Sequence, residues 1–319
     1  MGGAPFVVQR RQMLKTALLA PVLTRASPHS AVSTGESVVW TGSLPPYRSL
    51  STKTPDGVSI AIQVWGNPRG AALVLIHGLN QCRLSWLRQL DSELTERYQI
   101  VTYDLRGHGD SDKPTEPRYY AEGARWADEL AMVIEAAGVH RPALVGWSLG
   151  GVVLTSYLAR HGHEQIAAIN FVDAWTADNA SLYTAESEVL AESLLSSDLV
   201  TRLHGIRAFL SACFHTPPPR DLFELMLSFN SMPPVAVQKG ISAVTFDGAD
   251  AALRALRIPV VVTHGAHDRL FPVGMSRYTA AAVPGSQLSI YANSGHSPFM
   301  EDSRRFNREL KALLERAFG

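Results

Sequence analysis

Cysteine is scarce in this chain of 319 residues, which contains only Cys82 and Cys213. Neither cysteine belongs to a CxxC motif or to a paired-ligand spacing, so the sequence gives no sign of a cysteine-based zinc site or of a disulfide framework. One bridge between the two remains open from the sequence alone. Two buried free thiols are the simpler interpretation, because an unpaired cysteine behaves as a small apolar residue.

An excess of charge of one sign is also lacking, since 29 basic residues balance 29 acidic ones. No long-range field therefore attracts nucleic acid or an anionic surface, and we expect a small-molecule partner that is recognised locally in a pocket. Uncharged apolar runs stay well below the roughly 18 residues of a membrane-spanning helix, so no membrane span is predicted. The hydrophobic content of 46% is enough for a sizeable core. The oligomeric state is not encoded in any of these features.

The N-terminal segment has features of an export signal. Arg10 and Arg11 precede a short apolar stretch over residues 16–23, an arrangement that resembles a twin-arginine signal. Pro21 interrupts that stretch, however, and residues 27–37 contain no clear A-x-A cleavage site. Two interpretations stay open for residues 1–46: a signal that directs export, or a flexible extension of a cytoplasmic protein.

Short apolar runs alternate with amphipathic stretches through most of the remaining chain. Residues 47–53 and 58–64 are predicted to form an antiparallel hairpin around the turn signal Pro55-Asp56-Gly57. The further strand candidates are residues 72–76, 100–103, 143–146, 166–172, 259–263 and 287–291, and the helix candidates are residues 84–94, 121–137, 149–160 and 304–317. Several strands are apolar on both faces, which predicts an α/β fold with a doubly wound, mostly parallel sheet covered by helices on both sides.

Residues 175–250 interrupt this rhythm. The interval is much longer than an ordinary crossover and is rich in Leu, Phe and Ala, so we predict an inserted helical cap. The cap separates a first part of the core, residues 47–174, from a second part, residues 251–319. The prolines of residues 216–219 cannot continue a helix and are expected to divide the cap.

The strongest chemical signal is Gly146-Trp147-Ser148-Leu149-Gly150-Gly151, where an apolar strand meets a helix. A serine in this G-x-S-x-G context is typical of a nucleophile elbow, because the glycines permit a sharp turn that larger side chains would block. The N–H of Leu149, at the start of the helix, is expected to form half of an oxyanion hole. A second N–H is expected from Leu79, which follows the apolar strand and the His77-Gly78 turn. His77 itself is predicted to be structural.

A serine nucleophile needs a histidine that accepts its proton and a carboxylate that orients the histidine. His296 follows the last predicted strand, at the same end of the sheet as Ser148. Asp268 follows the buried strand before it and gives the chain order Ser, Asp, His. Asp173 ends a neighbouring strand and is the rival for the acid, although the loop position favours Asp268.

Substrate contacts are expected from aromatic side chains near the elbow and in the cap. Trp147, Trp175 and Phe209 are the predicted substrate-binding residues. The other cap aromatics considered are Tyr183, Phe214, Phe223 and Phe229. The alternative is that most of these rings simply pack the cap onto the core.

Taken together, these motifs resemble the α/β-hydrolase superfamily, and within it bacterial carboxylesterases and cofactor-free haloperoxidase-like enzymes. The resemblance covers residues 47–317 and is carried by HGL at 77–79, YDLRGHGDS at 103–111, GWSLGG at 146–151, and the GAHD and GHSP loops at 265–268 and 295–298. It implies the triad Ser148, Asp268 and His296, an oxyanion hole at Leu79 and Leu149, and no metal or cofactor. The RGHGDS segment looks structural in this family.

Two features of the sequence narrow the range of activities that this resemblance implies. Residues 79–82 read Leu-Asn-Gln-Cys, without the aromatic and proline residues common in haloperoxidase-like members, which disfavours perhydrolase or halogenation activity. Serine at position 148 disfavours the dehalogenase and epoxide-hydrolase branches, which use a carboxylate nucleophile. The resemblance therefore implies cleavage of small to medium, largely apolar carboxylic esters through an acyl-enzyme. A lactonase, a carbon-carbon bond hydrolase and a ligand-binding protein of the same fold are the alternatives.

Overall fold

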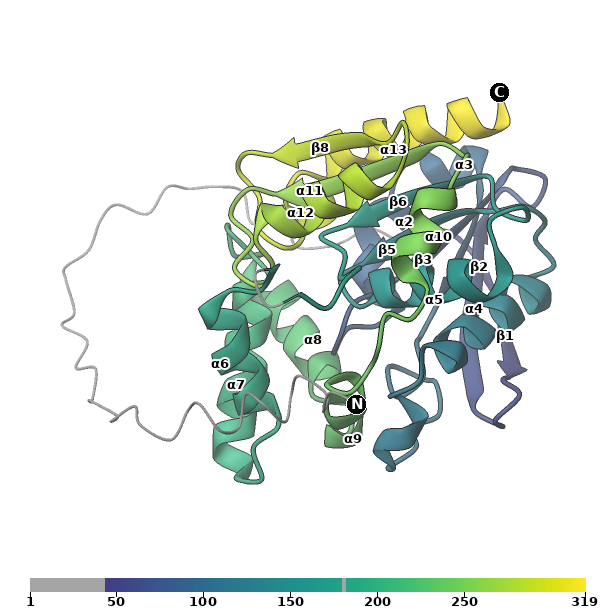
Figure 1. The fold of residues 1–319 in the computed structure, drawn as a ribbon. Helices are drawn as coiled ribbons and strands as arrows, with labels where there is room; N and C mark the ends of the chain where they lie inside the picture. Colours follow the sequence, from purple (N-terminus) through teal and green to yellow (C-terminus); the bar gives the residue numbers. More distant parts are fainter. Residues whose placement is uncertain (1–43, 180–181) are drawn as a thin grey trace, which may run out of the picture.

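A computed structural model describes residues 44–179 and 182–319 (Figure 1). The possible export signal lies outside the described residues. An eight-stranded sheet runs through the molecule in the order β1-β2-β4-β3-β5-β6-β7-β8. Its strands are β1 (Tyr47–Lys53), β2 (Ser59–Gly66), β3 (Ala72–Ile76), β4 (Gln99–Tyr103), β5 (Ala143–Trp147), β6 (Ala168–Val172), β7 (Val260–Gly265) and β8 (Gln287–Tyr291). β1 and β2 form the predicted antiparallel hairpin, and all strands from β4 to β8 across the sheet pair in parallel.

Helices cover both faces of the sheet, and the alternation of side chains along each strand supplies the two core layers. Val74 and Ile76 of β3 face one layer, which contains buried side chains of α4 (Gly123–Ala137), α5 (Gly150–His161) and α10 (Ala249–Ala255). Leu73 and Leu75 face the other layer, together with α13 (Ser303–Phe318) and the short helices that follow β3. The predicted doubly wound, mostly parallel α/β fold is therefore confirmed.

The predicted helix over residues 84–94 is wrong in its continuity. It is divided into η1 (Arg83–Trp86), α2 (Leu87–Leu90) and α3 (Leu94–Arg97). The Ser92 hydroxyl donates to the Gln89 carbonyl at 2.6 Å and accepts from the Leu94 N–H at 3.3 Å. A side chain that satisfies the backbone in this way replaces helical hydrogen bonds and ends the helix.

In the described part of the chain, four helices lie between β6 and α10. They are α6 (Ala185–Leu194), α7 (Leu199–Ala212), α8 (Arg220–Asn230) and α9 (Val235–Ile241), and Figure 1 shows them gathered on one side of the sheet. All four fall within the predicted cap. The proline tract lies between α7 and α8, whereas α10 packs against α5 of the core. Within the described part of the chain, no helix has both the length and the apolar character needed to cross a membrane.

The remaining elements are η2 (Pro117–Tyr119), α11 (Val273–Ala282) and α12 (Pro298–Glu301). Both cysteines are buried free thiols, so no bridge joins them. Cys82 lies just before η1, and Cys213 is the C-terminal cap of α7.

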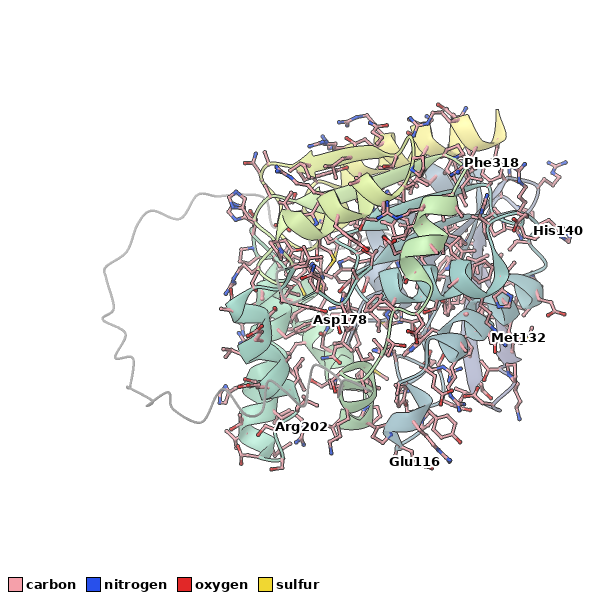
Figure 2. The ribbon with its side chains drawn as sticks, in the orientation of Figure 1. Glu116, Met132, His140, Asp178, Arg202 and Phe318 are labelled. Atoms are coloured by element: carbon pink, nitrogen blue, oxygen red, sulfur yellow. The ribbon has the colours of Figure 1, made fainter. Side chains whose placement is uncertain are left out.

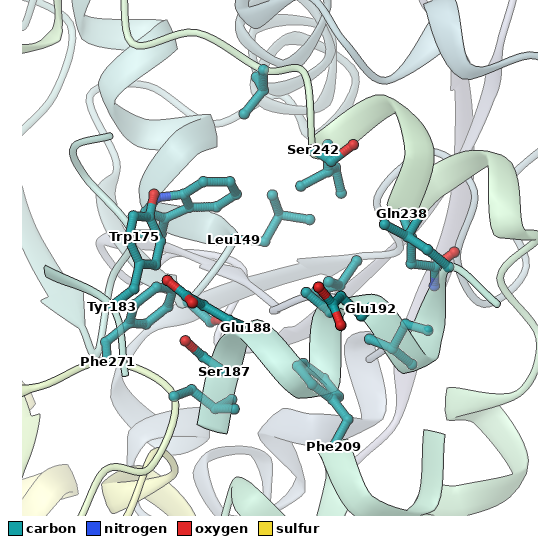
Figure 3. Close-up of a pocket in the computed structure, with 18 of the residues that line it drawn as sticks. Leu149, Trp175, Tyr183, Ser187, Glu188, Glu192, Phe209, Gln238, Ser242 and Phe271 are labelled. Carbon is teal, nitrogen blue, oxygen red and sulfur yellow. The ribbon is translucent and has the colours of Figure 1, made fainter. Parts of the chain in front are cut away.

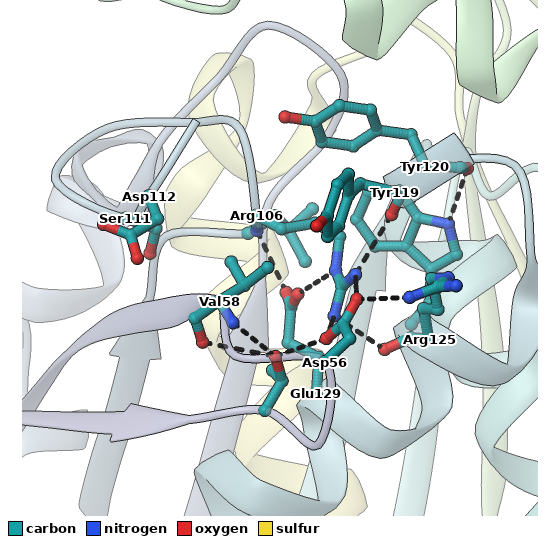
Figure 4. A network of polar contacts seen from close by, with 12 residues as sticks. Asp56, Val58, Arg106, Ser111, Asp112, Tyr119, Tyr120, Arg125 and Glu129 are labelled. Atoms are coloured by element: carbon teal, nitrogen blue, oxygen red, sulfur yellow. Dashed lines mark hydrogen bonds and ion pairs between the residues drawn. The ribbon is translucent and has the colours of Figure 1, made fainter. Parts of the chain in front are cut away.

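A buried ionic network secures the hairpin to the core (Figure 4). The Arg106 side chain is fully buried, with Nε 2.7 Å from Glu129 Oε2 and Nη1 2.8 Å from Asp56 Oδ2. Asp56 comes from the hairpin turn and Glu129 from α4. Burial alone disfavours the charge, but the two carboxylates outweigh it and the pKa of Arg106 is raised. This gives the RGHGDS segment a structural role.

Replacing Arg106 by methionine is expected to lower the free energy of unfolding by about 3 to 5 kcal/mol, because it leaves the Glu129 carboxylate buried without its partner. Urea unfolding followed by circular dichroism measures this loss. Arg125→Met is the matched control: its guanidinium also binds Asp56, at 2.6 Å, but is partly exposed, so its loss should cost about 1 kcal/mol or less. Equal losses in the two variants would contradict a dominant buried pair.

Candidate active site

Ser148 occupies a tight turn between β5 and α5. Its φ of 55° is in the left-handed region, which is strained for a residue with a side chain and is typical of functional turns. The Ser148 N–H donates to the Val172 carbonyl at 3.0 Å, and its carbonyl accepts from the N–H of Trp175 at 2.9 Å. These bonds to the end of β6 and the segment after it hold the turn in the strained conformation.

The glycines around Ser148 are required by close contacts. A Cβ on Gly146 would lie 2.7 Å from the Gly150 carbonyl oxygen, and one on Gly150 would lie 2.9 Å from the Ile76 carbonyl oxygen. A Cβ on Gly78 would lie 3.0 Å from the Cβ of Ser148, so the loop after β3 packs directly on the serine. The sequence pattern around residues 146–151 thus has the geometry expected of a nucleophile elbow.

Two backbone N–H groups near Ser148 are available to a ligand. Among the described residues, the N–H groups of Leu79 and Leu149 donate no hydrogen bond to another group. Both residues border the same cavity as Ser148. The next N–H, that of Asn80, is already used, because it donates to His108 Nε2 at 3.1 Å. Leu79 and Leu149 therefore remain the candidates for the oxyanion hole.

His77 and His108 are buried supports of this loop. His77 Nε2 accepts the Leu105 N–H at 2.9 Å, and its Nδ1 lies 2.8 Å from the Gly78 carbonyl oxygen. Burial lowers the pKa of each imidazole to about 3, so both are neutral at physiological pH. His77 thus has the contacts of a structural residue, as the sequence predicts.

His296 and Asp268 are brought together at the same end of the sheet. His296 Nδ1 lies 2.7 Å from Asp268 Oδ2, and the two side chains are 1% and 0% exposed. Asp268 Oδ1 accepts the N–H groups of Leu270 and Phe271 at 2.8 and 3.1 Å. Burial by itself raises the pKa of Asp268, but His296 and the other donors outweigh burial, so the net pKa is lowered and the carboxyl is ionised.

The other nitrogen of His296 is unoccupied by protein groups. Nε2 is buried and has no hydrogen-bond partner within residues 44–179 and 182–319. With Nδ1 bound to a carboxylate, the proton of a neutral imidazole resides on Nδ1, and Nε2 is left as a free acceptor. This is the atom that a general base uses.

Trp147 does not have the place at the cavity that a substrate-binding residue requires. Its indole is almost fully buried and does not border the cavity. Its Nε1–H donates to the His296 carbonyl oxygen at 2.6 Å, and its ring packs edge-on against Phe299. Trp147 therefore holds the backbone of His296 in place. The two residues lie in distant segments of the chain, so the local sequence does not reveal this contact.

Glu301 is a residue that sequence reasoning missed. Its Oε1 accepts the Gly295 N–H at 2.7 Å, while its Oε2 accepts the N–H groups of His215 and Thr216 at 2.9 and 2.8 Å. One carboxylate thereby joins the loop of His296 to the segment between α7 and α8. The only signal in the sequence was a carboxylate at the end of the short apolar stretch that follows His296.

A cavity of about 800 Å³ opens over Ser148 (Figure 3). This volume lies within the usual range for small-molecule sites. Trp175 and Phe209, two of the predicted substrate-binding residues, border it, and so does Tyr183. Phe214 and Phe229 are instead buried in the core layer shared with α13.

The lining includes apolar side chains next to Ser148 and both polar and apolar side chains along α6. Leu79, Leu149 and Phe271 border the cavity close to the serine. Carboxylates of Asp178, Glu188 and Glu192 also border it, all from residues with substantial exposure. Figure 3 shows Glu188 and Glu192 on one wall, and Figure 2 places Asp178 between the sheet and helices α6 and α7. The cavity lining thus combines apolar side chains next to Ser148 with exposed carboxylates.

Comparisons with known proteins agree with this architecture. The model of the alpha/beta hydrolase family matches residues 73–309. One similar crystal structure is that of a Burkholderia cenocepacia protein provisionally named an aryl esterase. Its sequence is 38% identical, its TM-score is 0.82, and the match covers 85% of this chain and 99% of that one. The esterase RhEst1 from Rhodococcus sp. ECU1013 is 31% identical with a TM-score of 0.78, over 84% of this chain and 99% of that one.

A curated relative carries a different activity in its name. RutD of Klebsiella pneumoniae, provisionally named a carbamate hydrolase, is 28% identical over 269 residues, which cover 80% of this chain and 94% of that protein. The names of these relatives have hydrolysis in common, but two of them name an ester and the third names a carbamate.

Proposed function

Because the chain belongs to the alpha/beta hydrolase family, we propose that it is a serine hydrolase that cleaves carboxylic esters through an acyl-enzyme. Ser148 is the nucleophile, His296 the general base and Asp268 the acid that orients it. The observation that carries the proposal is the state of His296: one ring nitrogen is held by a buried carboxylate, and the other is buried and unpartnered. His77 differs in this respect, because both of its ring nitrogens are engaged by backbone groups.

The reaction begins when Ser148 Oγ attacks the ester carbonyl carbon and His296 Nε2 takes the hydroxyl proton. The oxyanion that forms accepts hydrogen bonds from the N–H groups of Leu79 and Leu149, each worth about 3 to 4 kcal/mol of transition-state stabilisation. Collapse of the intermediate breaks the bond to the leaving oxygen, which receives the proton from His296. Water then attacks the acyl-enzyme by the same steps and releases the carboxylic acid and free Ser148.

The expected substrates are small to medium esters with a largely apolar acyl or alcohol group. The apolar side chains that line the cavity next to Ser148 support this choice, and so do the esterase names of the two structural relatives. No step in this cycle calls for a metal or an organic cofactor.

Hydrolysis of p-nitrophenyl esters of increasing acyl length is the test, with lactones and a diketone assayed in parallel. We expect turnover of the esters, with kcat/KM rising with acyl length until the cavity of about 800 Å³ is filled and then falling. Turnover of lactones or of the diketone alone would replace the ester assignment by a lactonase or a carbon-carbon bond hydrolase. Silence toward all substrates, together with no labelling by a serine-directed phosphonate, would favour a binding protein.

A further inference from the structure

A second buried carboxyl, that of Asp173, lies close to the carboxyl of Asp268. Asp173 follows β6, its φ is 42°, and its side chain is fully buried. Its Oδ1 accepts the Gly265 N–H at 2.9 Å and lies 3.3 Å from His264 Nδ1. Its Oδ2 is buried and accepts no hydrogen bond from any donor among the described residues. The mechanism proposed above makes no use of this residue.

Asp173, His264 and Asp268 form one cluster. Each contributes an oxygen or a nitrogen, and these atoms lie within 4.8 Å of one another. His264 Nδ1 lies 2.8 Å from Ser276 Oγ, and its Nε2 lies 3.6 Å from Asp268 Oδ2. Burial lowers the pKa of His264 more than the nearby Asp268 raises it, so this imidazole is neutral and brings no positive charge to the cluster.

The groups around Asp173 do not compensate a second negative charge next to that of Asp268. Besides Asp268, His264 and His296, the titratable groups that act on the cluster are Glu301 of α12 and Cys213 at the end of α7. In the described part of the chain, neither Asp173 nor Asp268 forms an ion pair with a lysine or arginine. Two adjacent carboxylates without a cation are costly in a buried site, so one of them retains a proton.

The hydrogen bonds decide which carboxyl keeps the proton. Asp268 receives two backbone N–H groups and the His296 Nδ1–H, all of which favour the ionised form. Asp173 receives only one backbone N–H, that of Gly265. Burial and the charge of Asp268 accordingly raise the pKa of Asp173 well above its ordinary value. Oδ2, the oxygen that accepts no N–H, is the natural place for the proton, and the carboxylate of Asp268 belongs to the same cluster and can accept it.

We propose that Asp173 is a positioning residue that keeps its proton and donates a hydrogen bond to the Asp268 carboxylate, which concentrates the negative charge on the carboxyl facing His296. The consequence for catalysis rests on the proposed function of Asp268, but the location of the proton does not. A neutral hydrogen-bond donor next to Asp268 orients the Asp268 carboxylate and adds no second negative charge near the His296 base.

The pH dependence of unfolding locates the proton without an activity assay. An aspartic acid whose pKa is raised by folding binds more protons in the folded state, so its contribution is lost as the pH rises above the ordinary aspartate value. Asp173→Asn keeps the shape and cannot ionise. We therefore expect Asp173→Asn to gain stability relative to the wild type, progressively above about pH 5, in urea unfolding. A stability difference that stays flat or falls with pH would overturn the proposal.

Asp56→Asn is the matched control for the unfolding experiment. Burial raises the pKa of Asp56, but Arg106, Thr54 and Arg125 outweigh burial and lower it. A carboxyl with a lowered pKa stabilises the fold above the ordinary aspartate value and loses that contribution as the pH falls. Asp56→Asn should therefore lose stability relative to the wild type, with a difference that is constant above about pH 5.

The pH profile of ester hydrolysis tests the positioning role. Asp173→Ala removes the hydrogen bond to Asp268 and should lower kcat about 10- to 100-fold, while Asp173→Asn, which retains a neutral donor, restores most of the rate. The acid limb of kcat/KM should keep its midpoint in Asp173→Asn. A shift of that limb to lower pH would mean that a negative charge had been removed from the neighbourhood of the base, and would overturn the proposal, as would a wild-type kcat in Asp173→Ala.

The two experiments separate this inference from the proposed function. If the wild type hydrolyses no ester, the proposed function fails and the unfolding experiment still decides where the proton lies. If esters are hydrolysed but unfolding shows no rising gain for Asp173→Asn, the proposed function stands and Asp173 is not the proton holder.

Discussion

Ser148→Ala is expected to lower kcat for ester hydrolysis by at least about 10⁴-fold while the fold stays intact. The variant lacks the hydroxyl that forms the acyl-enzyme, yet alanine fits the turn, because the Cβ of Ser148 already occupies the space beside Gly78. Initial rates with a p-nitrophenyl ester, together with labelling by a serine-directed phosphonate and intact mass analysis, measure the loss. Retention of rate or label in Ser148→Ala would remove the serine from its assigned role.

Ser228→Ala is the control for a serine outside the site. Its hydroxyl donates to the Glu224 carbonyl on the exposed surface of α8, and the variant should keep the wild-type rate. Ser148→Gly adds an independent check of the strained turn. Glycine accepts the φ of 55° without a steric penalty, so this inactive variant should be about 1 kcal/mol more stable than Ser148→Ala.

Asp268→Asn is expected to lower kcat by about 10³- to 10⁴-fold, the second large effect. The carboxylate accepts the His296 Nδ1–H at 2.7 Å, whereas an asparagine can present its NH₂ group to Nδ1 and place the imidazole proton on Nε2. Nε2 then cannot accept the proton of Ser148. The ratio of kcat between wild type and variant, measured from pH 5 to pH 9 with one ester, gives the size of the effect.

Asp173→Asn is the natural comparison for Asp268→Asn, because the two carboxyls are close together and both are buried. Of these two carboxyls, only that of Asp268 forms a hydrogen bond with His296 within the described residues. A loss of orders of magnitude in Asp173→Asn, with little change in Asp268→Asn, would transfer the role of the acid to Asp173.

Much of the fold was predictable because it is local. The residues 72–76 are apolar throughout and formed a strand with those bounds, and the hairpin turn at Asp56-Gly57 was encoded by its residue types. The helix predicted over residues 84–94 failed, because Ser92 hydrogen-bonds to the backbone on both sides of it. Periodicity records which side chains are apolar, but it does not record a polar side chain that competes for backbone hydrogen bonds.

For the candidate site, the sequence by itself determined the turn at Ser148 and the loops that contain His77, Asp268 and His296. Small residues at fixed offsets and apolar strands dictate such backbone paths without reference to the rest of the chain. Only the tertiary structure decided which of Asp173 and Asp268 bonds to His296, and that Trp147 and Glu301 hold the loop of His296. These contacts join segments that are distant in the chain, and their geometry depends on how the strands and helices pack, which residue types alone do not specify.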